Sequence, residues 1–454
     1  MTSSTGIRTL DRPLSPVEKW YWICDQLSPL NVVARGRVDG DLPVRLLREA
    51  LDLLQSRHPL LRVAVADADE REPRLVPTGA HIPLRQVVAA ADDDEERWVR
   101  ELNDHELVEH IDWRTGPLAR AVVVTHPGDD GEPARHDLLL GLVHSIADGT
   151  TVLALARQWL ELAAALRGEP AATGRGAERI LPPPDELLPE THRGEAGARL
   201  LTEKQERDQA EFERCRPARI EPEQPVPFER RRTALLHREL TPAQLDAVVA
   251  AAARAGATVH GALAAAIVAA VARDTPGGTD HVAIGSPITF RGDLAPPVGE
   301  HEVGTYVATV GSVVRTAPFW EMARQVSADV AARRARGEHL SMVNLLLGGG
   351  GPQTRAEWRE FLEFMEANGP INLCLSNLGR LDFPDRIGPW RVAEPQFVTG
   401  LSVNGYFVAT ASTSHGRLFW NFTYITDAVS HERARRLADG ALDALLAALD
   451  EPTS

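Results

Sequence analysis

The chain contains few cysteines, few aromatic residues and fewer basic than acidic side chains. Of its 454 residues, 3 are cysteines and 5% are aromatic. Cys24, Cys215 and Cys374 lie far apart without CxxC or Cys/His ligand spacing, so neither a disulfide framework nor a metal site is indicated. The formal net charge of -15 argues against general nucleic-acid binding, which requires an excess of Lys and Arg to neutralise phosphates.

Long apolar runs are missing as well. No segment approaches the ~20 apolar residues that a membrane-spanning helix needs, and residues 1–20 contain no apolar core of signal-peptide length. We therefore expect a cytoplasmic protein without a membrane span. Hydrophobic residues make up 43% of the chain and charged residues 25%, which is typical of a globular protein, and the length suits two or three domains.

Helix and strand patterns alternate in the first part of the chain. Ser15 and Glu18 on either side of Pro16 match a capping box, which predicts a helix from residue 16. Apolar residues at helical spacing after Asp41 predict a second helix with Asp41 as its cap. The other elements predicted here are strands over residues 32–38, 61–65, 118–125 and 137–143 and a helix over residues 152–166.

Residues 167–232 differ in character, because prolines cluster at 182–184 and 217–227 among charged residues. A helix over about residues 195–215 interrupts this stretch, which we interpret as a crossover between two domains. After it, Thr241 and Thr258 cap two predicted helices that end near residues 255 and 271. The remaining predicted elements are strands over residues 282–288, 306–314, 371–375, 398–403, 407–412 and 418–424 and helices over residues 319–336 and 430–449.

The most informative stretch is the end of the apolar run at residues 138–143, where His144 follows directly and Asp148 and Gly149 come soon after. A histidine at a strand end is often structural, but ionisable residues next to a buried strand also mark functional sites. Gly149 favours a tight turn, and no third ligand indicates a metal. His144 is then a candidate general base, and a buried Asp148 requires an arginine partner, for which Arg291 is the best candidate.

Other candidate motifs are weaker. The glycine run at residues 348–351 lacks the Lys-Ser/Thr of a phosphate-binding loop, and residues 400–405 do not match a GxSxG nucleophile elbow. Two basic clusters are interpreted as solvent-exposed, and they consist of Arg230, Arg231 and Arg232 and of Arg333, Arg334 and Arg336.

The segment His144-Ser145-Ile146-Ala147-Asp148-Gly149 resembles the HxxxDG signature of the chloramphenicol-acetyltransferase-like superfamily, which includes peptide-synthetase condensation domains and polyketide-associated acyltransferases. Further matches in family order are Leu14-Ser15-Pro16, His58-Pro59-Leu60-Leu61-Arg62, Gly116-Pro117-Leu118-Ala119-Arg120, Thr258-Val259-His260-Gly261 and Ser376-Asn377-Leu378-Gly379. Together these matches cover nearly the whole chain.

The resemblance implies an α/β fold of two two-layer sandwich domains that form a V-shaped pseudo-dimer with an interdomain tunnel. The corresponding domains are residues 1–182, which carry the motif, and residues 233–454, joined by a crossover at 183–232. His144 would deprotonate a nucleophile that attacks an acyl thioester on coenzyme A or on the pantetheine arm of an acyl carrier protein. Asp148 would be structural, paired with Arg291, and the Gly149 N–H and the Asn377 side chain are candidates for the oxyanion hole.

Two departures refine the resemblance. Val143 stands where condensation domains usually have a second histidine, and the late DFGWG motif of plant members is absent. Both features are more similar to freestanding polyketide-associated enzymes, so we predict a monomeric, ester-forming acyltransferase with a small-molecule acceptor from secondary or lipid metabolism. We expect no permanently bound cofactor. The alternatives are amide formation and a non-acylating scaffold or cyclase that binds a carrier protein.

Overall fold

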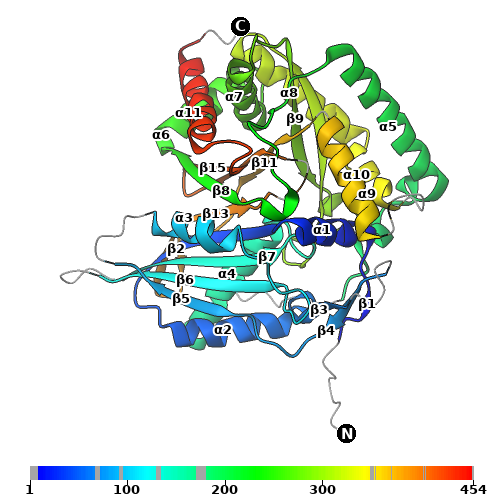
Figure 1. Cartoon of the computed structure of the whole chain (residues 1–454). Helices are drawn as coiled ribbons and strands as arrows, with labels where there is room; N and C mark the ends of the chain where they lie inside the picture. The colour runs from blue at the N-terminus through cyan, green and yellow to red at the C-terminus, as the bar shows by residue number, and fades with distance from the viewer. Residues whose placement is uncertain are drawn as a thin grey trace.

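A computed structural model describes residues 9–66, 72–90, 96–128, 134–169, 180–347, 352, 354–369, 371–401, 403 and 405–451. The described chain forms two halves that lie one above the other, each built around a six-stranded sheet (Figure 1). The predicted α/β character is therefore confirmed. The predicted glycine-run loop at 348–351 lies outside the described residues, as do residues 402 and 404 of the segment compared with the nucleophile elbow.

The first sheet positions the HxxxDG segment. Its strands, in spatial order, are β12 (Arg386–Ile387), β13 (Trp390–Thr399), β2 (Asn31–Asp39), β7 (Arg135–Val143), β6 (Ala119–His126) and β5 (Leu84–Val88). Neighbouring strands are antiparallel except β5 and β6, which are parallel. Helices α2 (Val44–Arg57) and α4 (Gly149–Leu166) pack together beneath this sheet, and β7 is buried along nearly its whole length, as predicted.

The second sheet consists of β10 (Val307–Arg315), β9 (His281–Thr289), β11 (Leu373–Arg380), β14 (Phe407–Ser414), β15 (Arg417–Ile425) and β8 (Thr233–Leu240). Its helices are α6 (Pro242–Arg254), α7 (Val259–Asp274), α8 (Phe319–Ala335) and α11 (His431–Ala447). Helix α7 packs between α8 and α11, and most of its alanines are buried, so these small side chains let the neighbouring helices approach closely.

Four further helices lie where the two halves meet or along one side of the second half (Figure 1). They are α1 (Pro16–Leu27), α5 (Gly194–Cys215), α9 (Glu338–Leu347) and α10 (Arg355–Asn368). The remaining elements are α3 (Arg97–Glu101), the small β1 (Arg12–Pro13), β3 (Val63–Ala66) and β4 (Arg74–Pro77) sheet, and the short turns η1 (Pro59–Arg62), η2 (Leu102–Glu106), η3 (Pro184–Leu187), η4 (Glu190–His192), η5 (Phe228–Arg230), η6 (Arg291–Asp293) and η7 (Ala448–Asp450).

The second half of the chain contributes two strands to the sheet of the first half. Strands β12 and β13 come from the second half of the chain but complete the first sheet, where β13 pairs with β2. A bulge in β13 places Glu394 in the left-handed region, with φ of 56°, and its carboxylate forms ion pairs with Arg35 and Arg37 of β2. The boundaries predicted at residues 182 and 233, like the pseudo-dimer arrangement, stay a prediction, and any such division has to allow for strands β12 and β13.

Local capping signals predicted the starts of α1, α6 and α7. Ser15 and Thr241 form complete capping boxes, and Thr258 and Ser430 cap α7 and α11. The prediction for Asp41 was wrong, because α2 begins at Val44 with Pro43 as its N-cap. The physical reason is that a residue before proline is disfavoured in the helical region, so the helix cannot extend back past Pro43.

The interpretation of the two arginine clusters as solvent-exposed was wrong in part, because each cluster contains one buried arginine. Arg231 is buried, and its guanidinium makes two hydrogen bonds, 2.6 and 2.7 Å long, to the Glu366 carboxylate. Arg333 is also buried, surrounded by carboxylates of three helices. Its ion-pair partners are Asp208, Glu211, Asp329 and Glu338. Buried arginines require partners, and here Glu366, Asp208 and Glu211 come from segments distant in sequence, which local patterns do not reveal.

Some elements of the structure were not predicted, and one predicted strand ends earlier than expected. Strand β13 ends at Thr399, although residues 398–403 were predicted as a strand, and β8, α9 and α10 were not predicted. The start of helix α10 could have been predicted, because Thr354 and Glu357 form a capping box. Among the described residues, no single helix is long and apolar enough to cross a membrane, and the α6–α7 pair passes that test by length and composition only together, with a bend of 98°.

Candidate active site

His144 lies immediately after β7, at the junction of the two halves. Its backbone N–H donates to the Leu30 carbonyl at 3.0 Å, and its own carbonyl accepts from the Thr305 hydroxyl at 2.5 Å. The imidazole lines a large internal cavity. Because Nδ1 is a buried atom, Nε2 is the ring nitrogen that can meet a substrate.

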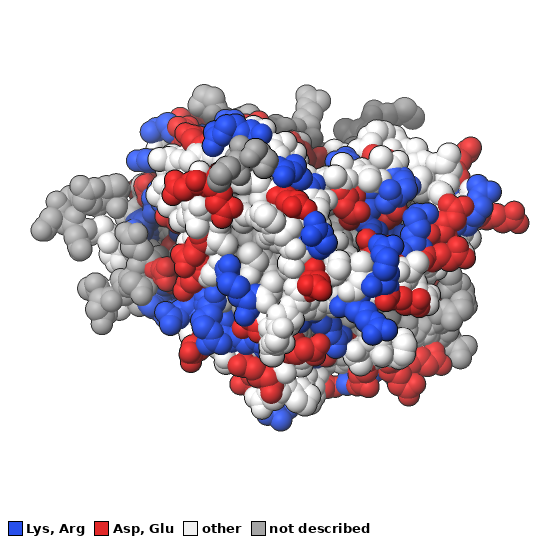
Figure 2. Space-filling model, turned by 90° about the horizontal axis from the view of Figure 1, so that it is seen from above, with Lys and Arg blue, Asp and Glu red and all other residues white. Residues whose placement is uncertain are grey.

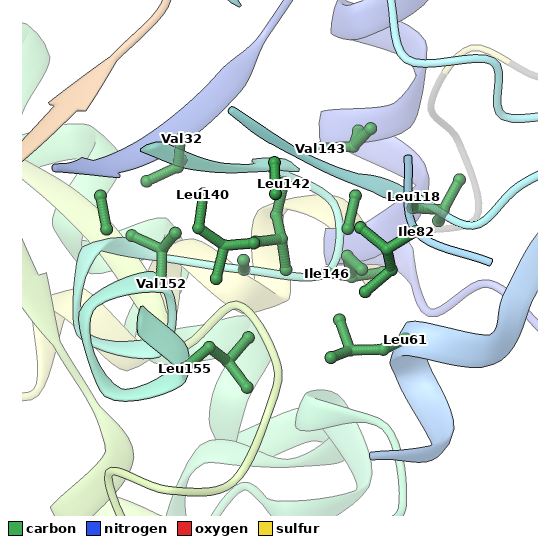
Figure 3. Close-up of a cluster of buried hydrophobic side chains, with 14 of the residues drawn as sticks. Val32, Leu61, Ile82, Leu118, Leu140, Leu142, Val143, Ile146, Val152 and Leu155 are labelled. Atoms are coloured by element: carbon green, nitrogen blue, oxygen red, sulfur yellow. The ribbon is translucent and has the colours of Figure 1, made fainter. Parts of the chain in front are cut away.

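The residues after His144 anchor the loop in the core. Ile146 and Ala147 are fully buried, and Ile146 lies among Leu118, Leu142 and Leu61 (Figure 3). Since this cluster also holds β7 against α4, the loop cannot move without disturbing the core. The His144 backbone is thus held rigidly at the cavity wall.

Asp148 is the N-cap of α4 and braces the loop. One carboxylate oxygen accepts from the Thr151 N–H at 2.8 Å, and the other accepts from the Tyr306 N–H at 3.0 Å. Arg291 completes the set, with its Nη2 3.1 and 3.3 Å from the two oxygens, so the predicted ion pair is present. Burial alone would raise the pKa of Asp148, but Arg291 and these hydrogen bonds outweigh it and hold the pKa below its usual value.

Arg291 also forms hydrogen bonds to a loop of the second half. Its Nη1 donates to the carbonyl oxygens of Gly299 and Glu302, both at 2.9 Å. The Thr151 hydroxyl donates to the Gly304 carbonyl at 2.7 Å, which fastens the same loop to α4. The HxxxDG segment of the first half is therefore clamped by residues 291–306 of the second half.

Gly149 serves a different purpose from the predicted one. It is the first residue of α4 rather than part of a turn, and it does not have the positive φ that favours glycine. A Cβ placed on it would lie 2.8 Å from two ring carbons of Phe397 in β13 and 3.1 Å from Leu378 in β11. Glycine is needed because the side chains of Phe397 and Leu378 approach the start of α4 closely.

We expect Gly149→Ala to lower the free energy of unfolding by about 1–3 kcal/mol, because the Phe397 ring would have to move in a packed region. Urea denaturation measures this change. Gly440→Ala is the matched control, since Gly440 lies in α11 with only ordinary contacts around it, and there alanine should stabilise by up to about 1 kcal/mol. Equal behaviour of the two variants would contradict the close-approach explanation.

Asn377 lies in β11 and lines the same cavity. Its side-chain oxygen accepts from the Gly379 N–H at 2.8 Å, which orients the amide so that its NH₂ group is the part free to donate to a ligand. The Gly149 N–H belongs to the first turn of α4, where the helix dipole favours negative charge. Both predicted oxyanion donors therefore border the cavity that His144 faces.

The cavity has a volume of about 1070 Å³ and is lined by both halves. Its wall is mostly apolar, and three aromatic side chains from α1 and α10 pack edge to face in it. These are Trp20, Trp358 and Phe361, with ring centroids 5.5, 6.4 and 5.9 Å apart. Ligand pockets are commonly ~300–1,000 Å³, so the space suits a large ligand or two ligands together.

Burial in this wall lowers the pKa of His144, and hydrogen bonding to the backbone of His144 itself and the neighbouring charge of Asp148 offset this only in part. The imidazole is consequently neutral near pH 7, which is the form that accepts a proton. Stacked on it is Tyr21 of α1, with centroids 4.2 Å apart and planes 8° from parallel.

Sequence reasoning identified the motif, Arg291 and Asn377, but it did not single out Tyr21, Thr305 or Tyr306. Thr305 and Tyr306 carried no local signal, because they reach the site through tertiary contacts of a loop. Tyr21 follows the capping box of α1 in an aromatic Trp-Tyr-Trp run, and that concentration of rings in a chain poor in aromatic residues was the available signal.

Comparison with known proteins gives a consistent picture. Residues 229–385 match the family model described as phthiocerol/phthiodiolone dimycocerosyl transferase C-terminus. Over 346 residues the chain is 27% identical to the phosphinothricin tripeptide synthetase PhsB of Streptomyces viridochromogenes, an alignment that covers 73% of this chain and 27% of that protein. The other curated synthetases it matches are spanned over only 2–4% of their length.

Solved structures show the same fold across the whole chain. SgcC5 of Streptomyces globisporus, solved with a naphthyl ethanediol and sucrose, superimposes with a TM-score of 0.68 at 18% identity and covers 97% of this chain and 99% of its own. The TRI3 trichothecene 15-O-acetyltransferase of Fusarium sporotrichioides has a TM-score of 0.75 at 12% identity and covers 98% and 97%. The resemblance inferred from the sequence is therefore confirmed: residues 229–385 match the dimycocerosyl transferase family model, and the chain has the fold that these solved structures share.

Proposed function

We propose that the protein transfers an acyl group from a thioester to a hydroxyl group of a small, largely apolar acceptor, with His144 as general base. The observation that carries the proposal is a neutral histidine in the wall of a large cavity that both halves enclose. A general base needs both a suitable pKa and access to the proton that it removes, and His144 has both.

The reaction would proceed by addition and elimination. His144 Nε2 accepts the proton of the acceptor hydroxyl while the oxygen attacks the thioester carbonyl carbon, and the carbonyl electron pair moves onto oxygen. When the tetrahedral intermediate collapses, the carbon–sulfur bond breaks and the leaving sulfur takes the proton from the imidazolium. The Gly149 N–H and the Asn377 NH₂ group would donate to the intermediate oxygen.

Asp148 takes no part in these proton transfers. Both of its oxygens are engaged by Arg291 and by backbone N–H groups, and no hydrogen bond joins its carboxylate to the described His144 ring. Its proposed role is structural, as the brace between α4 and the loop of the second half. In this respect the site differs from a Ser-His-Asp triad, where the aspartate orients the histidine.

The cavity wall supports an apolar acceptor or acyl chain. The charged residues in it are few, and Lys204 is paired with Asp208 at 2.5 Å while Asp148 is paired with Arg291. Aliphatic side chains and several aromatic rings line the rest of the wall, which suits a ring-containing or long apolar group. The SgcC5 structure holds an alcohol with a naphthyl group, which supports a hydroxyl acceptor of this chemical class here.

We propose coenzyme A or a carrier-protein pantetheine as the bearer of the acyl thioester. Figure 2 shows acidic and basic side chains interspersed over most of the face seen there. A mixed surface of this kind provides no broad basic field for an acidic carrier protein, and the overall net charge of -15 opposes one. Acyl-coenzyme A, which needs no docking surface for a protein, is the first donor to assay.

Amide formation is the second candidate, because relatives such as PhsB are peptide synthetases. Matched acceptors that differ only in a hydroxyl or an amino group, offered with the same acyl-coenzyme A, separate the two reactions. We expect the ester to form at least tenfold faster. Faster amide formation would reverse the assignment, and absence of both products with every thioester, including carrier-bound ones, would favour a non-acylating scaffold.

A further inference from the structure

The His144 ring is covered on one face by an aromatic ring that the proposed chemistry does not use. Tyr21 lies parallel to the imidazole at a centroid distance of 4.2 Å, and both side chains border the cavity. We propose that Tyr21 is a positioning residue, whose ring holds the imidazole plane so that Nε2 is directed into the cavity. This inference rests on the proposed function of His144 as general base.

Apart from the Tyr21 ring, the groups that act on the His144 imidazole are the backbone of His144 itself and of Ala147 and the charge of Asp148. A catalytic histidine is usually oriented by a hydrogen bond from its second nitrogen to a third group. Here Nδ1 is buried without such a side-chain bond, and Asp148 is committed to Arg291. The bonds to Leu30 and Thr305 hold only the His144 backbone, so they leave the side-chain torsions free.

Helix α1 is built to hold Tyr21 still. The capping box of Ser15 and Glu18 fixes its first turn, and Arg12 bonds both oxygens of the buried Glu18 at 2.7 Å. Val17 packs into a cluster with residues of η3 and α9, which belong to other parts of the chain. A ring on a helix anchored in this way can restrict its neighbour to one orientation.

Tyr21 itself is not a plausible base. Burial raises the pKa of its hydroxyl far above the usual value, and the nearby charge of Asp148 raises it further, so the phenol stays protonated. The hydroxyl makes no hydrogen bond to any described residue, and removing it should therefore leave the fold unchanged. These properties assign the effect of Tyr21 to its ring.

Two substitutions distinguish an effect of the Tyr21 ring from an effect of its hydroxyl group. With acyl-coenzyme A and the preferred acceptor, Tyr21→Phe should keep kcat within about threefold of the unmodified protein. Tyr21→Leu, which fills similar space without a flat face, should lower kcat on the order of 10–100-fold, because small misplacement of a reacting group costs up to about 10²-fold. KM should change little in both variants. The result is read together with the pH profile of kcat/KM.

The pH profile supplies a readout that simple loss of structure would not change. Burial holds the pKa of His144 below its ordinary value, so opening its face to water in Tyr21→Ala should move the acid limb of kcat/KM to higher pH, toward about 6.5. Tyr21→Phe should leave that limb in place. The carboxylate that acts on His144, Asp148, is unchanged in both variants.

Tyr424→Leu is a matched control, because Tyr424 is a buried tyrosine that bonds His431 at 2.9 Å outside the cavity. It should lower stability without changing kcat of the folded protein. Tyr21→Leu with kcat within threefold, or Tyr21→Phe as impaired as Tyr21→Leu, would overturn the positioning role. If the unmodified protein forms no acyl product, the proposed function fails. That outcome is distinct from the two results for the Tyr21 variants that would overturn the positioning role.

Discussion

Replacing His144 with alanine is expected to lower kcat by roughly 10²–10⁴-fold with saturating thioester, the contribution typical of a positioned general base. The reason is that His144 is the one histidine among the described residues of the cavity wall, and burial keeps its imidazole in the neutral form that accepts a proton. Lys204 is paired with Asp208, and Tyr21 stays protonated. Initial rates of ester formation, followed by release of free thiol and by chromatography of the product, measure the effect.

The folding of this variant should be nearly normal, because the loop is held by Ile146 and by backbone bonds of residue 144 rather than by the imidazole. His260→Ala is the matched control, since His260 is another largely buried histidine, with a pKa lowered by burial to about 4 and a bond to Ser286 at 2.9 Å. Its kcat should stay within a few-fold. Activity of His144→Ala in that same range would remove His144 from the mechanism.

Replacing Asp148 with alanine is expected to lower the free energy of unfolding by about 3–5 kcal/mol, because Arg291 would be left buried without its counter-charge. Both side chains are nearly inaccessible, with 5% and 6% of their surface exposed, so solvent screens this pair little. The rate should also fall, since the loop that carries His144 loses its brace. Urea denaturation and kcat, measured on the same preparation, give both quantities.

The pair should also make stability depend on pH. The pKa of Asp148 is depressed in the folded protein, so its contribution is fully present above the unfolded value of about 3.9 and is lost as pH falls through the lower folded value. The stability difference between the unmodified protein and Asp148→Asn should therefore shrink below about pH 4. Asp148→Asn with unchanged stability but no activity would show a direct chemical role instead.

Asp137→Asn provides the comparison for this experiment. Asp137 pairs with Arg35 in the first sheet, and both side chains are buried, but neither lines the cavity. We expect a similar loss of stability with kcat of the folded protein unchanged. Loss of activity in both variants would indicate that destabilisation alone explains the effect at Asp148.

Much of the local structure could be predicted because its causes are local. Capping boxes at Ser15 and Thr241 and the apolar periodicities of β7 and α7 act within a few residues, and these four elements appear within a few residues of their expected places. The pairing of Asp148 with Arg291 was also predictable, since a buried carboxylate needs a cation and Arg291 follows a predicted strand.

The errors at the two arginine clusters and at Gly149 share one cause, which is that segments distant in sequence are in contact. Arg231 and Arg333 are polar in sequence but buried by carboxylates that come from elsewhere. Gly149 is small because Phe397 of β13 lies against it, and β13 itself joins the sheet of the other half. None of these contacts has a local periodicity that a single sequence could reveal.

By itself, the sequence determined where the strand before His144 ends, which residues compose the motif and where helices α1, α6 and α7 begin, because hydrophobic periodicity and capping are short-range effects. Only the tertiary structure decided what surrounds the motif. The loop of residues 291–306 that clamps Asp148, the apolar cavity and the Tyr21 ring on the imidazole all come from segments far apart in the chain. Burial and neighbouring charge, which set the pKa of His144, exist only once those segments have packed.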